Sequence, residues 1–236
     1  METPGYTALT RQSGLMREMQ VIANNIANAS TTGFRREGVV FSEYITRLES
    51  EPSLSMGYAN ARHVDLAQAG LSQTGGTFDL GLQGEGFFLI ATPEGERLTR
   101  AGAFSPSGEG VLVTPDGHPL LDAGGAPVPV PIGARAVSIA TDGTLSADGQ
   151  PVAQIGVWRP VDPLSLRHQT GTLFSAQAIE PIENTVIRQG FLEDSNVQPV
   201  SEIARMITVQ RAYELGQKFL DAEDQRQRNV IQTLGR

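Results

Sequence analysis

Residues 23–36 read Ala-Asn-Asn-Ile-Ala-Asn-Ala-Ser-Thr-Thr-Gly-Phe-Arg-Arg, and they follow a segment with helical periodicity that begins at Tyr6. Within this segment one stripe of side chains recurs at alternating spacings of three and four, at Leu9, Gln12, Met16, Met19, Ala23 and Ile26. A lone helix with so narrow a stripe is marginal in water, so it needs a partner. We expect the helix to stop at residues 30–33, where hydroxyl side chains compete for backbone groups and Gly33 supplies a positive φ.

The expected partner is a second long helix at the other end of the chain. Residues 199–235 contain no proline after Pro199 and one internal glycine, Gly216. Apolar side chains recur there every seven residues, at Met206, Tyr213 and Leu220, and Ile203 supports the same register. We expect Asp194, Ser195 or Asn196 to cap the start of this helix.

Between the two helices the sequence pattern changes to that of short strands. Residues 86–91 are strongly apolar and bounded by glycine and proline, which is typical of a buried strand. Further short strands are expected at residues 111–113, 128–132, 137–139, 154–158 and 172–174. The Asp-Gly dipeptides at 116–117, 142–143 and 148–149 suit tight turns.

The predicted fold class is therefore α+β, with N- and C-terminal helices pairing as a coiled-coil-like stem and an inserted all-β domain, either a sandwich or a barrel. We place the N-terminal helix at residues 1–30, an extended connector at 31–76, the all-β domain at 77–185 and the C-terminal helical segment at 186–236.

Composition narrows the classes of function. The formal net charge of −8 comes with 18 scattered Lys and Arg residues, so the sequence has no basic stripe for nucleic acid. The absence of cysteine excludes disulfides and thiolate sites. No apolar run approaches the roughly 20 residues of a membrane span, and the N-terminus has no pattern of a cleaved signal peptide.

Residue patterns give no sign of catalysis or of a cofactor. The three histidines, His63, His118 and His168, lie far apart, and a glycine-rich run at 81–86 lacks the helix that a phosphate loop requires. Asp142 lacks the further oxygen ligands of a calcium loop. We therefore expect no catalytic, metal or cofactor residues, and a protein that is not an enzyme. The competing class is a cell-wall glycan-binding module or enzyme, which the aromatic content of 6% and the single tryptophan, Trp158, disfavour.

Three ordered motifs resemble those of the axial proteins of the bacterial flagellum, specifically the basal-body rod proteins. The first is residues 24–34, the second joins residues 80–88 to 98–104, and the third joins residues 192–197 to the segments 206–207 and 210–214. The opening Gly5-Tyr6-Thr7-Ala8 and the compact connector are most similar to the proximal-rod members, with distal-rod members as the alternative.

The resemblance implies a structural subunit that is exported through the flagellar type III apparatus and polymerises with copies of itself and other rod proteins into the periplasmic drive shaft that transmits motor torque. It implies neither membrane insertion nor a cleaved signal peptide. The expected helical assembly interface consists of Leu9, Met16, Met19, Ile26, Ile203, Met206, Tyr213 and Leu220. The expected signature turn consists of Asn24, Asn25, Asn28, Thr32, Gly33 and Phe34, and the expected start of the C-terminal helix of Glu193, Ser195, Asn196 and Val197.

Overall fold

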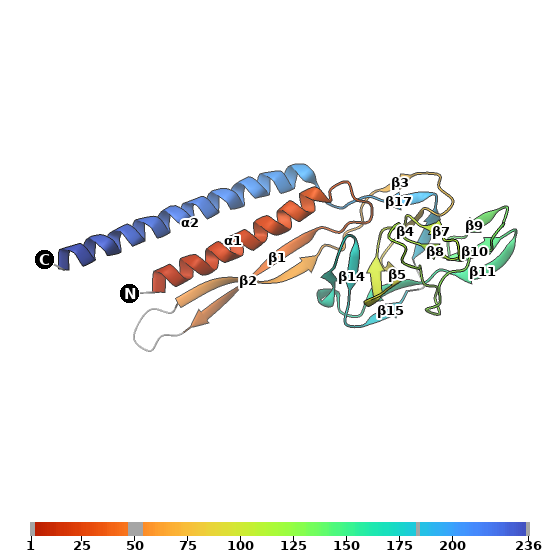
Figure 1. Cartoon of the computed structure of the whole chain (residues 1–236), viewed down its shortest axis with the longest axis horizontal. Helices are drawn as coiled ribbons and strands as arrows, with labels where there is room; N and C mark the ends of the chain where they lie inside the picture. Colours follow the sequence, from red (N-terminus) through yellow and green to blue (C-terminus); the bar gives the residue numbers. More distant parts are fainter. Residues whose placement is uncertain (1–2, 47–53, 183–184, 235–236) are drawn as a thin grey trace. The chain divides into compact units, whose positions relative to one another are not determined.

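The computed structural model describes residues 3–46, 54–182 and 185–234, and the chain divides into two compact units (Figure 1). The first, which we call the helical unit, comprises Met1–Ala27, Glu37–His63 and Gln198–Arg236. The second, the β unit, comprises Asn28–Arg36 and Val64–Val197. Two helices and a mostly β unit confirm the predicted α+β class.

The helical unit is built from two helices and one pair of strands. Helix α1 (Thr3–Ala27) packs along α2 (Pro199–Leu234) and against β1 (Glu37–Thr46), which pairs with β2 (Leu54–Val64). Figure 1 shows α1 and α2 side by side. The segment that we expected as an extended connector therefore holds two long strands, and one of them supports the N-terminal helix.

Helix α1 ends at Ala27, three residues before the predicted limit. A turn follows at once, in which the Thr31 amide donates to the Asn28 carbonyl at 3.1 Å. Gly33 has the expected positive φ, +72°, but lies six residues beyond the helix, so it is not the helix cap. The Gly33 amide instead donates to the carbonyl of Glu193 at 2.7 Å.

The predicted capping of α2 is wrong. The helix begins at Pro199, whose fixed φ and missing N–H suit the first helical position. Asn196 Oδ1 accepts from the Arg36 amide at 2.6 Å, and Ser195 Oγ accepts from the Val197 amide at 3.3 Å. These side chains are therefore engaged within the β unit.

A six-stranded sheet forms the largest part of the β unit. Its order is β13 (Arg167–His168), β14 (Leu173–Ser175), β6 (Gly95–Thr99), β5 (Phe87–Thr92), β12 (Val157–Pro160) and β15 (Ile179–Pro181). A three-stranded sheet has the order β11 (Gln150–Gln154), β10 (Thr144–Ala147) and β9 (Val137–Ile139). The two-stranded pairs are β16 (Val186–Gln189) with β4 (Leu80–Gln83), β17 (Phe191–Glu193) with β3 (Leu71–Gln73), and β7 (Ser105–Pro106) with β8 (Leu112–Val113). A 3-10 turn covers Pro163–Ser165.

Strand β5 lies between the two apolar cores of this unit. Because successive side chains of a strand point to opposite faces, Phe88 and Ile90 enter one core while Phe87 and Leu89 enter the other. All four are at most 3% exposed, which confirms the buried strand expected from residues 86–91.

Two of the predicted strands differ from the structure. Residues 128–132 make only isolated bridges, because prolines 127, 129 and 131 have no N–H to donate to a ladder. The predicted strand at 154–158 is divided between β11 and β12 by Ile155 and Gly156. Residues 186–193, which we grouped with the C-terminal helix, form β16 and β17, and the two strands are separated by Gly190 at φ +77°.

The Asp-Gly dipeptides do form turns. Asp148 and Gly149, with φ of +50° and +81°, connect β10 to β11, as two-residue hairpin loops require. Asp142 Oδ1 accepts from the Thr144 amide at 2.9 Å, and this hydrogen bond lowers the pKa of the Asp142 carboxyl. The carboxylate therefore stabilises its own turn.

Candidate functional site

One buried asparagine ties α1 to both of its neighbours in the helical unit. Asn25 is 0% exposed, and its side chain bonds the Glu37 backbone twice: Nδ2 donates to the carbonyl at 2.9 Å and Oδ1 accepts from the amide at 3.0 Å. The same Nδ2 donates to Oε2 of the buried Glu202 on α2 at 3.1 Å. A single amide group thus fixes the register of helix, strand and second helix.

Two further polar contacts join the helices toward their outer ends. Gln12 Nε2 donates to the Tyr213 carbonyl at 2.9 Å, and this side chain occupies the space that Gly216 leaves, since a Cβ there would stand 2.3 Å from Gln12 Nε2. Arg205 Nη2 lies 2.9 Å from Glu18 Oε1. Gly216 therefore provides a notch for Gln12 in the contact between the helices.

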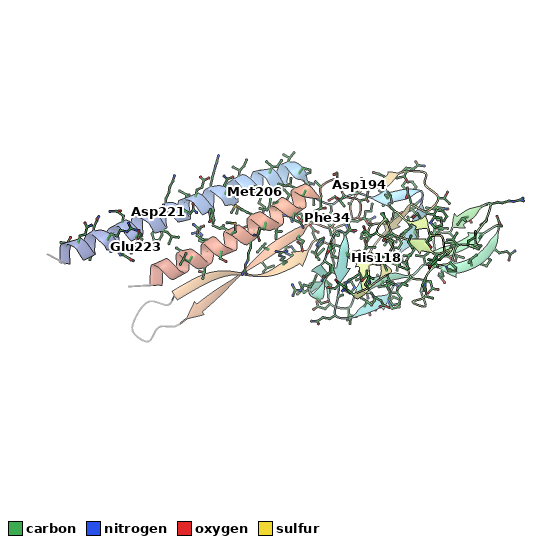
Figure 2. All side chains as sticks on the ribbon, viewed as in Figure 1. Phe34, His118, Asp194, Met206, Asp221 and Glu223 are labelled. Carbon is green, nitrogen blue, oxygen red and sulfur yellow. The ribbon has the colours of Figure 1, made fainter. Side chains whose placement is uncertain are left out.

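The eight residues of the expected assembly interface are exposed or half-buried within one chain. The buried apolar side chains of the helices are Val21 and Ile22 on α1 and Val209 on α2. Among the expected eight, three are exposed, namely Leu9, Met16 and Ile203. The other five are half-buried, namely Met19, Ile26, Met206, Tyr213 and Leu220. Figure 2 labels Met206 on α2, with Asp221 and Glu223 nearer the C-terminal end of that helix.

Exposed apolar side chains border a groove along the helix pair. The groove has a volume of about 520 Å³ and is lined by residues of both helices, Ala8, Arg11, Gln12, Leu15, Ala212, Leu215, Gly216 and Phe219. Leu215 is 67% exposed and Phe219 is 52% exposed. Large side chains exposed together beside an apolar groove are typical of a protein interaction surface.

Replacement of Asn25 by leucine tests the tie between the helix and the strand. Leucine has nearly the same volume but removes the side-chain partner of the Glu37 amide and of the Glu37 carbonyl, at a cost of about 1–3 kcal/mol for each unsatisfied group, and it also removes one hydrogen bond to Glu202. We expect faster hydrogen exchange at the Glu37 amide and weaker swimming. Leucine in place of the exposed Gln20 is the control and should alter neither. Unchanged exchange at Glu37 in the Asn25 variant would contradict this role.

In the β unit, the N-terminal and C-terminal signature segments meet at a buried carboxylate. Glu193 on β17 is 1% exposed, and its two oxygens contact Arg35 Nη2 at 2.8 Å and Arg100 Nη1 at 3.0 Å. Oε1 also accepts from the Ala69 amide at 3.0 Å. Arg35 Nη1 donates to the Ala67 carbonyl, and Arg100 Nη2 donates to the Gly84 carbonyl at 2.6 Å. One carboxylate therefore holds two buried cations from distant parts of the chain.

Burial dominates the electrostatics of this cluster. It lowers the pKa of Arg100 to about 10, because desolvation disfavours the cation, the neighbouring Arg35 adds repulsion, and Glu193 opposes both. The pKa of Arg35 is lowered by burial as well, again against the attraction of Glu193. In both groups the attraction of Glu193 opposes the effect of burial, so the cluster depends on this shared partner.

The backbone of the signature turn joins the same cluster. Beside the bond from Gly33 to Glu193, the Asn196 amide donates to the Phe34 carbonyl at 3.4 Å, and Asn196 Nδ2 donates to the Asp65 carbonyl at 3.0 Å. The Phe34 ring meets His168 edge-on at 5.4 Å between centroids. Figure 2 shows Phe34 and Asp194, which come from the two signature segments.

The six signature residues are divided between the two units. Asn24 and Asn25 belong to the helical unit, while Asn28, Thr32, Gly33 and Phe34 belong to the β unit. Two of the four residues expected at the start of the C-terminal helix, Glu193 and Asn196, accept hydrogen bonds from residues 33–36. Val197 is buried, and Ser195 is half-buried.

Sequence reasoning missed the charged partners in these contacts, namely Arg35, Arg100, Glu37, Glu202, Glu18 and Arg205. Arg100 stands in a motif quoted for the resemblance, but no role was assigned to it. The signal in the sequence was that Arg100 is a charged residue within an apolar strand region. Because arginine is rarely buried unless it is paired, such a residue indicates a buried ion pair.

The described residues offer no cluster for a metal ion. Within residues 3–46, 54–182 and 185–234, no group of three His, Cys, Asp or Glu side chains is placed to hold one. His168 lies between Phe34 and Phe174 in the β unit, and His63 lies against Gly38 in the helical unit. Neither described helix is long and apolar enough to cross a membrane.

Comparison with known proteins assigns the family. Three family models match in order: "Flagella basal body rod protein" at residues 3–35, "Flagellar hook protein FlgE/F/G D1 domain" at residues 81–147, and "Flagellar basal body rod FlgEFG protein C-terminal" at residues 188–233. These segments contain α1 with the signature turn, the first core strands of the β unit, and β17 with α2.

Relatives similar over the whole chain agree with these matches. The flagellar basal-body rod protein FlgF of Caulobacter vibrioides is 36% identical over 100% of this chain and 99% of its own length, and that of Mesorhizobium japonicum is 37% identical over the same shares. The rod protein FlgG of Bacillus subtilis is 29% identical over 93% of this chain and 94% of its own length. With family models at both ends and the middle, and relatives that align throughout, the chain belongs to the family of flagellar basal-body rod proteins.

Proposed function

We propose that this chain is a structural, non-enzymatic subunit of the proximal part of the flagellar rod, which polymerises through α1 and α2 with copies of itself and other rod proteins. The observation that carries the proposal is the apolar groove of the helix pair, with Leu215 and Phe219 exposed beside it. These apolar side chains contribute no stability while they are exposed to water, whereas a neighbouring helix would bury them. Repetition of one such contact without closure gives a helical assembly.

The eight residues of the expected assembly interface are proposed for the same role. Their incomplete burial within one chain leaves apolar area for contact with neighbouring subunits. Polar bonds such as that from Gln12 to the Tyr213 carbonyl set the register of the coiled-coil-like stem, while the surrounding apolar side chains make the contacts between chains.

The proximal position is supported by the comparisons. The FlgF relatives align over all of this chain, whereas the FlgG relatives cover 88–93% of it. A distal-rod position is the alternative. We further propose export through the flagellar type III apparatus without a cleaved signal peptide, and a periplasmic location in the assembled rod, where the subunit transmits motor torque.

The substitution Phe219→Asp tests the groove. A charge in place of the exposed Phe219 should leave the monomer folded but prevent burial of the groove in the rod, because an unpaired charge is costly to desolvate. We expect loss of swimming and of basal bodies with complete rods, with normal circular dichroism of the purified chain. Gln217→Asp adds the same charge to an exposed site on the same helix outside the groove lining, and should swim. Normal motility of the Phe219 variant would contradict the proposal.

A further inference from the structure

The segment between α1 and β1 belongs by its contacts to the β unit, although the elements on both sides of it belong to the helical unit. Residues 28–36 form this segment, and we call its last four residues, 33–36, the clasp. Phe34 is 0% exposed and Arg35 is 1% exposed. The clasp is therefore an inserted part of the β unit and not a linker on its surface.

Backbone hydrogen bonds join the clasp to residues near both ends of the long segment of the β unit. The Gly33 amide donates to the Glu193 carbonyl at 2.7 Å. The Arg36 carbonyl accepts from the Asp65 amide at 2.8 Å, and the Arg36 amide donates to Asn196 Oδ1 at 2.6 Å. Since Asn196 Nδ2 also donates to the Asp65 carbonyl at 3.0 Å, the three strands of chain are bonded to one another.

The side chains of the clasp reach further into the same unit. The Phe34 ring meets His168 edge-on at 5.4 Å between centroids. Arg35 Nη2 lies 2.8 Å from Glu193 Oε1, and Arg35 Nη1 donates to the Ala67 carbonyl. Release of the clasp would therefore expose an aromatic ring and separate a buried ion pair, both of which oppose release.

The two units differ in how many apolar side chains they bury. The β unit has two cores, with fourteen and six buried apolar side chains. Among the side chains of the helical unit that the structure describes, the buried apolar ones are Val21, Ile22 and Val209. Helices take most of their stability from such packing, and regions with few buried contacts open at the lowest free energy. We therefore expect the helical unit to open while the β unit, with the clasp, stays folded.

The clasp sets how far apart the ends of the two helices can move when they are not paired. Ala27, the last residue of α1, lies six residues before Gly33, and Pro199, the first residue of α2, lies six residues after Glu193. Without the clasp, the path from α1 to the β unit would run through residues 28–63. That path is roughly three times as long, and closure of a longer loop lowers the effective concentration of one helix at the other by about fivefold.

We propose that the clasp keeps the ends of α1 and α2 joined while the helical unit is open, so that a subunit with unpaired helices still presents both of them from one point. The use of this device rests on the proposed rod function, in which α1 and α2 contact neighbouring chains. Two helices that leave the β unit together search a smaller volume for each other and for a shared neighbour, which favours their entry into the rod as a pair.

Hydrogen exchange of the 15N-labelled full-length chain in rising concentrations of urea, followed at single amides by nuclear magnetic resonance, tests the clasp. The Glu37 amide, which bonds to the Asn25 side chain in the helical unit, should begin to exchange first. The Gly33 and Arg36 amides should stay protected until the Leu120 amide, in the core of the β unit, exchanges. Exchange of Arg36 together with its neighbour Glu37, ahead of Leu120, would overturn the proposal, and so would simultaneous exchange of all four amides.

Substitutions at two neighbouring residues distinguish the clasp from its surroundings. Asn196→Ala removes the acceptor of the Arg36 amide, so we expect Arg36 to exchange about tenfold faster or more, at urea concentrations that leave Leu120 protected. Ser195→Ala is the matched control, because Ser195 Oγ accepts from the Val197 amide, and it should leave the order of exchange unchanged. Equal exchange at Arg36 in the two variants would overturn the assignment of these bonds to the clasp.

Swimming in soft agar measures what the clasp contributes to assembly. The Asn196→Ala chain should form fewer complete rods and swim more slowly than the Ser195→Ala chain. Normal swimming by a chain whose Arg36 amide exchanges early would overturn the role of the clasp in assembly. The Phe219→Asp chain, which alters the groove and not the β unit, should keep the protection of Arg36. Failure of the proposed helix contact and failure of the clasp therefore give different results.

Discussion

Replacement of Glu193 by glutamine is expected to lower the free energy of unfolding of the β unit by about 3–5 kcal/mol, the cost of removing one partner from a buried ion pair. Glutamine has the same shape, but it removes the buried carboxylate that Arg35 and Arg100 share and turns an N–H group toward one of them. Urea denaturation followed by the fluorescence of Trp158, which lies on β12 in the same unit, measures the change. Swimming should be lost as well, because the two signature segments meet on this carboxylate.

Glu180 provides the matched control for Glu193. It pairs with Arg159 at 2.6 Å, but both side chains are about half exposed, and such surface pairs contribute roughly 0–1 kcal/mol. Glu180→Gln should therefore leave the denaturation midpoint almost unchanged. Equal midpoints for the Glu193 and Glu180 variants would show that the buried cluster does not stabilise the β unit.

Gly33→Ala is the second substitution with a large expected effect. Gly33 has φ +72°, and a Cβ there would stand 2.2 Å from the backbone nitrogen of Ala101, which cannot move aside as a flexible side chain can. The φ value alone costs a non-glycine residue about 1–2 kcal/mol, and displacement of the signature turn from Arg100 and Ala101 adds to it. We expect a lower denaturation midpoint for the β unit and defective rod assembly, seen as reduced swimming.

The variant Gly75→Ala distinguishes backbone strain from steric collision in this experiment. It has φ +73°, yet nothing lies within 4 Å of the position that a Cβ would take, so Gly75→Ala carries the strain alone. We expect Gly33→Ala to be clearly more destabilising than Gly75→Ala, and Ala29→Ser to be close to neutral. Equal midpoints for the two glycine variants would exclude a steric role for Gly33.

Much of the fold was predictable where one local pattern determines an element. The apolar run that contains Phe87 predicted strand β5, the Asp-Gly dipeptide at 148–149 predicted a hairpin turn, and a long stretch without proline predicted α2. The predicted strand at 128–132 was wrong, because alternate prolines allow only every second residue to donate to a ladder, although Val128 and Val130 are buried.

The contact between the helices was less predictable, because polar residues occupy its centre. A stripe chosen for apolar side chains passes through Met16 and Ala23, which are exposed, while Glu18 and Asn25 are buried. Their burial depends on Arg205 for Glu18 and on Glu37 and Glu202 for Asn25, and no spacing within α1 reveals these partners. The burial of Arg35 and Arg100 likewise depends on Glu193, which is more than 90 residues from Arg100 in sequence.

The bonds between residues 33–36 and 193–196 also bear on how the β unit responds to mechanical load. Gly33 bonds Glu193, Arg36 bonds Asn196, and the Asp65 carbonyl accepts from Asn196 Nδ2, so the chain is joined to itself where it enters most of this unit at Val64 and leaves it at Val197. Tension applied through the flanking segments passes directly across these bonds, in parallel with the long path through the sheets. The sheets therefore bear less of the pulling force than the bonds at the base of this unit.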